Sequence, residues 1–135
     1  MATRRDVFLL PALLTPAFAA SGLSESTVRA SAAKVTKADF GETSVYFDGP
    51  TGQLQSLYAG SVLLHPGQQP HPPHQHPEEE IVVIAEGNGS IFLDGKWSPA
   101  PLGTMMYCGA NKLHGIRNTG KTPLLFYFSK WKAGA

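Results

Sequence analysis

The chain has 135 residues, of which 42% are hydrophobic and 16% are charged, and this balance excludes both a disordered charged tail and a membrane bundle. The formal net charge is +1, which leaves no electrostatic surface for nucleic acid and excludes that class of partner. The single cysteine excludes an intrachain disulfide and a CxxC metal or redox pair.

The first twenty residues have the features of an export signal. Two arginines at positions 4 and 5 precede an apolar run over residues 7–20, and residues 17–19 have the small-x-small pattern of a signal-peptidase site. The run contains two prolines and falls short of the ~20 apolar residues that span a bilayer. We therefore expect residues 1–20 to be a signal peptide, twin-arginine or general, cleaved near Ala19-Ala20. The alternative is an ordinary N-terminal strand or helix.

Cleavage would leave a periplasmic or secreted protein with no charge bias and no membrane partner. The remaining chain would carry nine basic and nine acidic residues, so it has no general attraction for a charged polymer. Its length suits one domain. Residues 21–40 begin with small and polar side chains and are expected to form an N-terminal arm or edge strand, and residues 41–135 are expected to form the domain.

Strands separated by turns are predicted along the rest of the chain. The Gly and Pro content, 14 and 11 residues, argues against long helices. Residues 81–84 are β-branched and predict a strand buried on both faces. Residues 87–89 predict a hairpin to the next strand, and Asp94-Gly95 predicts another turn after it. The expected strands are 44–48, 54–64, 80–86, 90–93, 104–108, 113–118 and 124–131. With an N-terminal edge strand this makes about eight, so we expect an all-β sandwich or barrel.

The five histidines all fall between residues 65 and 114, and some of them predict a metal site. In an extended chain His74, His76 and Glu80 have the same parity and can face one point. Two imidazoles and a carboxylate are a ligand set for transition metals, and His114 could supply a fourth ligand from the opposite sheet. The alternative is that the histidines belong to an exposed, proline-rich loop that takes up metal only incidentally.

The first of these segments resembles a motif of the cupins. That motif is G-x5-HxH-x(3,4)-E-x6-G, and it appears here as Gly67, six residues in place of five, His74-Gln75-His76, then Glu80 and Gly87.

A second cupin motif, G-x5-PxG-x2-H-x3-N, appears further along the chain as Gly103, Gly109-Ala110-Asn111, His114 and Asn118. Gly109 stands where the family has Pro, and Asn111 stands where it has Gly. Both residues form turns readily, so we expect the turn to survive.

This resemblance implies a double-stranded β-helix, a jelly-roll barrel with a metal inside. Its ligands would be His74, His76, Glu80 and His114, holding one divalent transition metal: Fe, Mn, Ni, Cu or Zn. Glu80 could also leave the metal and act as a general base. Gly67, Gly87, Gly103 and Asn118 would be structural positions of the motifs, with Asn118 bracing a turn.

The substrate pocket is expected to be lined by Tyr58 and by one face of the strand before His114. That face is either Met106 and Cys108 or Met105 and Tyr107, because successive side chains of a strand point in opposite directions. Cys108 has no partner and is interpreted as a small core residue, with a reactive thiol as the alternative.

Two histidines and the tryptophans are expected to lie outside the ligand set. His71 has the opposite parity to His74 and is predicted to be loop surface, or otherwise a proton shuttle at the mouth of the pocket. His65 is predicted to end a strand with no catalytic part. Trp97 and Trp131 are predicted to cover the barrel or to fill a subunit contact, and we expect a homodimer.

The resemblance supports three functional hypotheses, since one fold serves many reactions. The first is a mononuclear metal dioxygenase acting on a small enediol or phenolic substrate, like the quercetin dioxygenase-like cupins. The second is a redox-neutral isomerase, lyase or decarboxylase in which the metal is a Lewis acid. The third is a module that binds a small ligand without turnover.

Overall fold

The computed structural model describes residues 22–135. The predicted signal peptide, residues 1–20, lies outside the described residues, so export stays a prediction. Within the described part of the chain, no helix is long and apolar enough to cross a membrane.

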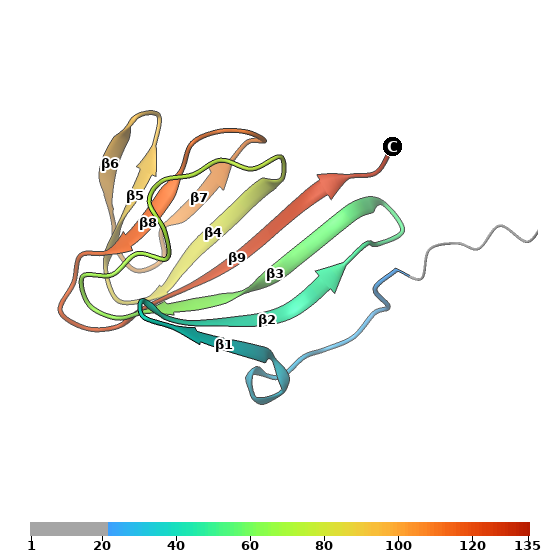
Figure 1. Cartoon of the computed structure of the whole chain (residues 1–135), viewed down its shortest axis with the longest axis horizontal. Helices are drawn as coiled ribbons and strands as arrows, with labels where there is room; N and C mark the ends of the chain where they lie inside the picture. Colours follow the sequence, from blue (N-terminus) through green and yellow to red (C-terminus); the bar gives the residue numbers. More distant parts are fainter. Residues whose placement is uncertain (1–21) are drawn as a thin grey trace, which may run out of the picture.

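The described residues form an all-β sandwich, which confirms the predicted fold class. The elements are η1 (Ala30–Ala32), β1 (Lys34–Ala38), β2 (Gly41–Gly49), β3 (Leu54–Leu64), β4 (Glu79–Glu86), β5 (Gly89–Leu93), β6 (Lys96–Ala100), β7 (Met105–Cys108), β8 (Gly115–Asn118) and β9 (Leu124–Ala133). A six-stranded sheet has the order β1-β2-β3-β9-β4-β7, and a three-stranded sheet has the order β6-β5-β8. Figure 1 shows the small sheet standing at the β4–β7 end of the large one, the arrangement of a jelly roll.

The core lies between the two sheets, because alternate residues of each strand turn to the inside. In β4 the inward residues Glu80, Val82 and Ile84 are buried, whereas Ile81 and Val83 are only half-buried. The expectation that this strand is buried on both faces is therefore wrong, because only its inner face is covered by the second sheet. The buried apolar side chains are Val62, Leu64, Val82, Ile84, Ile91, Ala100, Met106, Cys108, Ile116, Leu124, Phe126 and Phe128.

The predicted hairpin between β4 and β5 does not form. β4 pairs with β7 and β9, while β5 pairs with β6 and β8, so the chain crosses from one sheet to the other at this turn. Gly87 makes the crossing feasible: its φ is 78°, and an added Cβ would lie 2.5 Å from the Pro123 carbonyl oxygen. The hairpin of this region is β5–β6, where Asp94 and Gly95 have φ of 52° and 77°, as a type I′ turn requires.

Two edge strands complete the sheets. β6 was not predicted as a strand, and it contains Pro99. It is an edge strand that pairs only with β5. An edge strand tolerates proline, which cannot donate a hydrogen bond to a neighbouring strand. β1 pairs only with β2 and follows η1, so the N-terminal region contains both an extended arm and an edge strand (Figure 1).

Large side chains are exposed on the outer face of the six-stranded sheet. Met105 and Tyr107 on β7 and Tyr127 on β9 are exposed and point away from the core. Such a surface is what a homodimer would cover, but the structure describes one chain and the homodimer stays a prediction. Trp131 also lies on this face and donates a hydrogen bond from its Nε1 to Glu79, whereas Trp97 packs against Phe92 on the small sheet.

Asn118 links the ends of three segments. Its side chain is 2% exposed, donates to the carbonyl oxygens of Leu64 at 3.1 Å and Thr122 at 2.8 Å, and accepts from the Gly120 N–H at 2.9 Å. The end of β8 is thereby tied to the end of β3 and to the turn before β9. The motif glycines Gly67, Gly87 and Gly103 all have positive φ.

We expect Asn118→Ala to lower the free energy of unfolding by about 2–3 kcal/mol, because it leaves buried backbone groups without partners. Urea denaturation measures this change. Asn88→Ala is the matched control, since Asn88 is exposed and its loss should change stability by no more than about 0.5 kcal/mol. Equal midpoints for the two variants would contradict the assigned role of Asn118.

Candidate metal centre

A single antiparallel bridge brings two distant histidines together. The His74 N–H donates to the His114 carbonyl oxygen at 2.8 Å, and the His114 N–H donates to the His74 carbonyl oxygen at 2.9 Å. Figure 1 shows the long loop between β3 and β4 passing next to β8, where this bridge forms. Because residues paired in this way point to the same face, both imidazoles turn to the interior.

Close packing of the loop on β8 depends on Gly115. A Cβ at this position would lie 3.1 Å from Pro73 Cγ and 3.2 Å from Pro73 Cα, so any side chain would press on the residue before His74. Gly115 therefore allows the loop to approach β8 closely enough for the bridge to form.

A turn after β7 holds the third histidine. The Asn111 N–H donates to the His76 carbonyl oxygen at 2.7 Å. Asn111 has a φ of 58°, a left-handed conformation that Asn adopts more readily than most residues. This is the position where the cupin motif has glycine, so the conformation of the turn is retained in spite of the substitution.

The three imidazoles form a compact cluster. One nitrogen atom from each of His74, His76 and His114 lies within 4.8 Å of the others, and the ring centroids are 4.8–5.1 Å apart. His76 Nδ1 lies 3.1 Å from the Glu78 carbonyl oxygen and His114 Nδ1 lies 2.9 Å from the Lys112 carbonyl oxygen. A carbonyl oxygen can only accept a hydrogen bond, so each Nδ1 carries the hydrogen and donates it. The Nε2 atoms of both rings are then left to point inward.

Glu80 completes the cluster from β4. Its Oε2 lies 3.0 Å from His76 Nε2 and 2.9 Å from His114 Nε2, and the residue is 9% exposed. The residues predicted as ligands are therefore brought together, although the parity argument does not explain how: His76 belongs to no strand, and a loop and one bridge position the histidines.

The electrostatics of the cluster suit a cation. Burial, followed by the neighbouring His71, lowers the pKa of His74 to about 4, so this ring is neutral at pH 7. Burial alone would raise the pKa of Glu80, but hydrogen bonds and charges from His114 and His76 outweigh it and lower that pKa. Burial would likewise lower the pKa of His114, but its hydrogen bonds to Glu80 and Lys112 outweigh burial and raise it.

The donor set fits a divalent transition metal. Three imidazoles and one carboxylate at this spacing are the ligands that Fe, Mn, Ni, Cu and Zn accept, and the carbonyl groups on two Nδ1 atoms are the outer contacts that orient metal-binding histidines. The set does not distinguish among these metals.

Two cavities adjoin the cluster. An inner cavity of about 40 Å³ reaches the apolar core at Val82, Met106, Ile116 and Phe126. An outer cavity of about 120 Å³ lies between the histidines and the aromatic residues Tyr58 and Phe128. His71, His74, Glu80 and Phe126 line both cavities, so a small molecule in the outer cavity would face the cluster.

The strand before His114 presents Met106 and Cys108 to the interior, and Tyr107 is not in this pocket. Tyr107 is 57% exposed, and its hydroxyl donates to Glu79 on the outer face, so its assignment to the substrate pocket is wrong. The physical reason is the strand alternation that buries Met106 and Cys108. Tyr58 does line the outer cavity.

Cys108 packs behind His114. Its sulfur lies 3.3 Å from His114 Nδ1, and burial, followed by the charge of Glu80, raises the pKa of the thiol. The thiol is therefore protonated at pH 7 and is a poor metal donor.

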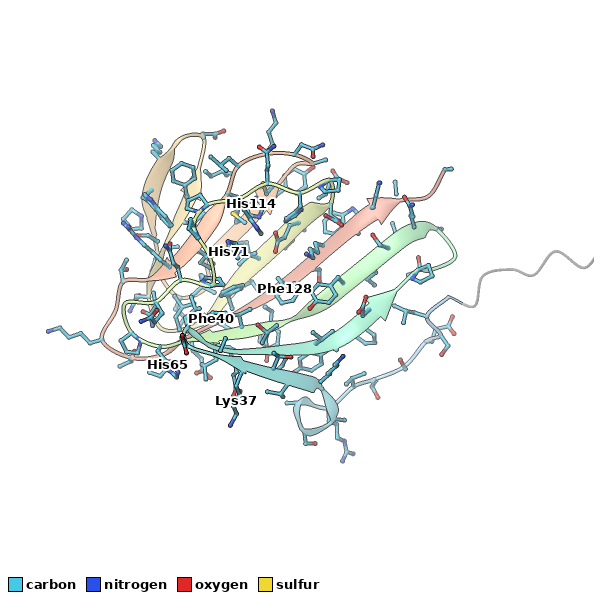
Figure 2. The ribbon with its side chains drawn as sticks, viewed as in Figure 1. Lys37, Phe40, His65, His71, His114 and Phe128 are labelled. Atoms are coloured by element: carbon cyan, nitrogen blue, oxygen red, sulfur yellow. The ribbon has the colours of Figure 1, made fainter. Side chains whose placement is uncertain are left out.

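The two remaining histidines have different positions. His71 stacks on His74 with ring centroids 3.7 Å apart and lines both cavities, so it stands at the mouth of the pocket rather than on remote loop surface. His65 is exposed and its N–H bonds to the Phe40 carbonyl oxygen. Figure 2 shows His65 beside Phe40 and away from His71 and His114.

Sequence reasoning missed Gly115 and Lys130. Lys130 lines the outer cavity together with His71, His74, His76 and Glu80. The sequence did contain a signal for Lys130. Residues 124, 126 and 128 of β9 are buried and apolar, and the next position with the same parity is this lysine. The contact of Gly115 with Pro73 has no sequence signal, since the two residues belong to segments that meet only in the folded chain.

Comparison with known proteins identifies a family for most of this region. A family model described as a cupin domain matches residues 60–129, which include every residue of the cluster. No curated protein matches the chain.

Solved structures share the fold at low sequence identity. An RmlC-like cupin from Shewanella frigidimarina is 16% identical with a TM-score of 0.67, covering 82% of this chain and 93% of that one. An uncharacterized conserved protein with a double-stranded beta-helix domain from Klebsiella pneumoniae is 18% identical with a TM-score of 0.65, covering 83% and 94%. The polyketide cyclase RemF from Streptomyces resistomycificus is 17% identical with a TM-score of 0.64, covering 80% of each chain.

We expect the double variant His74→Ala/His114→Ala to lose bound metal, because it removes two of the four donors. Elemental analysis of the purified protein, incubated with zinc and then desalted, measures the metal content. His65→Ala is the control and should keep the wild-type content. Full metal occupancy in the double variant would contradict the site.

We expect Gly115→Val to weaken zinc binding by about tenfold or more, because pushing Pro73 away separates the backbones of His74 and His114. Competition with a chromophoric chelator measures the affinity. Gly52→Val is the matched control, since a Cβ at Gly52 meets nothing within 4 Å. If both variants bind zinc like the wild type, the loop does not depend on this contact.

Proposed function

The chain belongs to the cupin family, and from this premise we propose that it is a metal-dependent enzyme acting on a small organic substrate. One observation carries the proposal: three imidazoles, with one nitrogen atom of each within 4.8 Å of the others, adjoin a buried carboxylate, and all four groups line one cavity or the next. His74, His76, His114 and Glu80 would hold one divalent transition metal.

The reaction that we propose is the dioxygenation of an enediol or phenolic substrate. A redox-active metal in this site would supply a Lewis acid and a centre for oxygen chemistry. The chain's own contribution is exclusion of water and control of one proton. Val82, Met106, Ile116 and Phe126 close the inner cavity with apolar groups, which keeps bulk water away from the reacting atoms.

When its carboxylate is not bound to the metal, Glu80 is the group that would accept the proton of a substrate hydroxyl. Its carboxylate is buried, lines both cavities, and has a lowered pKa because His114 and His76 outweigh the effect of burial. It is therefore ionised at pH 7 and available as a base beside the imidazoles.

The volume of the outer cavity suits a small substrate. The outer cavity of about 120 Å³ is comparable to the roughly 150 Å³ cavity that encloses one benzene molecule in another protein. A compound with a single ring fits beside the histidines, whereas a compound with three rings would extend into solvent.

A redox-neutral reaction is the second candidate, and the position of Glu80 favours it as well. A carboxylate held between two imidazoles can move protons without any electron transfer, as an isomerase, lyase or decarboxylase requires. Among proteins of similar fold, RemF is a polyketide cyclase.

We expect oxygen uptake by the protein loaded with iron, manganese, nickel or copper when a catechol, a flavonol or a β-diketone is supplied, with catechols favoured by size. Zinc-loaded protein should consume no oxygen, because Zn²⁺ is not redox-active. An oxygen electrode measures the rate, and the His74→Ala/His114→Ala variant controls for free metal.

Two outcomes would contradict the dioxygenase. One is product formation without oxygen uptake, which would support the redox-neutral candidate. The other is stoichiometric zinc in the purified protein with no oxygen consumption after any metal exchange, which would support ligand binding without turnover.

A further inference from the structure

One inward row of the six-stranded sheet differs chemically from the buried apolar rows beside it. Residues directly opposite each other in antiparallel strands point to the same face, so the register defines inward rows that cross the sheet. The titratable row consists of Asp48, Tyr58, Lys130, Glu80 and Cys108, joined by the pairs Asp48–Tyr58, Tyr58–Lys130, Lys130–Glu80 and Glu80–Cys108.

The two inward rows on the core side of the titratable row are apolar. The next row contains Gly60, Phe128, Val82 and Met106, and the row after it contains Val62, Phe126 and Ile84. In the buried part of this face, ionisable groups therefore lie only at the level of the histidine cluster. The row beyond it pairs Ser56 with Lys132, which is exposed near the end of β9. A core needs no such row for stability, because buried charges cost free energy unless they are paired.

Lys130 is the cation of this row. It is half-buried, and its Nζ lies 5.0 Å from the centre of the Tyr58 ring. It lines the outer cavity together with the three clustered histidines and Glu80. Lys130 pairs directly with Glu80 in the strand register. The two side chains therefore leave the sheet next to each other on the same face.

No carboxylate of residues 22–135 forms an ion pair with Lys130. The ion pairs within that range join His76 and His114 to Glu78 and Glu80. Glu80 is directed at the two imidazoles, and Asp48 is exposed at the end of the row beyond Tyr58. A lysine at an inward position is seldom buried without a partner, so this ammonium is available to an anionic group in the cavity.

We propose that the outer cavity binds a small aromatic or enolic organic acid, with its anionic group on Lys130 and its hydroxyl groups toward the histidine cluster. The planar part of such a ligand would lie against Tyr58 and Phe128, which line the same cavity. The inference rests on the proposed function, since it names the substrate class of the same site.

The test compares two probes of similar size and shape, one anionic and one neutral. The compound 3,4-dihydroxybenzoate carries a catechol at one end and a carboxylate at the other, and 3,4-dihydroxybenzamide replaces the carboxylate with a neutral amide. Zinc-loaded full-length protein is used, because zinc binds the catechol oxygens without oxidising them. Isothermal titration calorimetry measures both dissociation constants.

We expect the acid to bind the wild-type protein about tenfold or more tightly than the amide, as a hydrogen bond to a charged group allows. Lys130→Met should reduce this ratio to about twofold or less, leaving zinc content and amide affinity unchanged. Lys130→Arg should retain the preference, because it keeps the charge. Lys37→Met is the matched control: this lysine is exposed on β1, at the far edge of the sheet in Figure 2, and its removal should leave the ratio intact.

Several results would overturn the inference. They are equal binding of acid and amide by the wild type, an unchanged ratio in Lys130→Met with full zinc content, loss of the ratio in Lys130→Arg, and no binding of either probe. Zinc content is measured on the same samples and the titration is repeated after chelation. A preference for the acid that depends on Lys130 in protein unable to hold metal would refute the metal centre but support the anion site.

Discussion

The two backbone hydrogen bonds between His74 and His114 are the interaction on which the candidate metal centre depends. The loop from β3 to β4 contains four prolines between residues 68 and 77, and proline has no N–H to donate. Few backbone groups are therefore left to attach this loop to the sandwich, and His74 provides both a donor and an acceptor. Because the partner residue is itself a ligand candidate, the contact that fixes the loop also assembles the cluster.

The residues around the cavity are positioned in two ways, some by paired strands and some by loop contacts. Glu80 and Lys130 lie opposite each other on β4 and β9, in the middle of the larger sheet, and their positions follow from the strand ladder. His74 and His76 come from a loop, and His114 lies directly before the short strand β8. Their geometry depends on single contacts outside the strand pairing. Examples are the close approach of Gly115 to Pro73 and the hydrogen bond from the Asn111 N–H to the His76 carbonyl oxygen. Sites held by secondary structure are more precise than sites held by loops, so these contacts supply the precision.

The separation of polar and apolar rows gives the pocket its chemical character. Phe126, Phe128 and Met106 fill the inner rows and exclude water, while Glu80 and Lys130 occupy the row next to the histidines. In the low dielectric of such an interior, an electrostatic contact is stronger than in water. This would strengthen both of the proposed interactions, a cation in the cluster and an anion on Lys130. The cavity beside these residues has a volume of about 120 Å³, which accommodates a small ligand.

Much of this could be predicted from the sequence, because it depends on neighbours along the chain. Alternation and turn residues identified most strands, and the spacing of His74, His76 and Glu80 identified the ligand candidates. The spacing could not show that the chain crosses to the other sheet after β4 instead of forming a hairpin, that Tyr107 faces outward, or that Lys130 lines a cavity with the histidines. Each of these depends on which strands pair and in which register, and pairing is decided by the packing of two sheets over one core. The sequence by itself determined the residue types of the site, and only the tertiary structure decided which of them share one cavity.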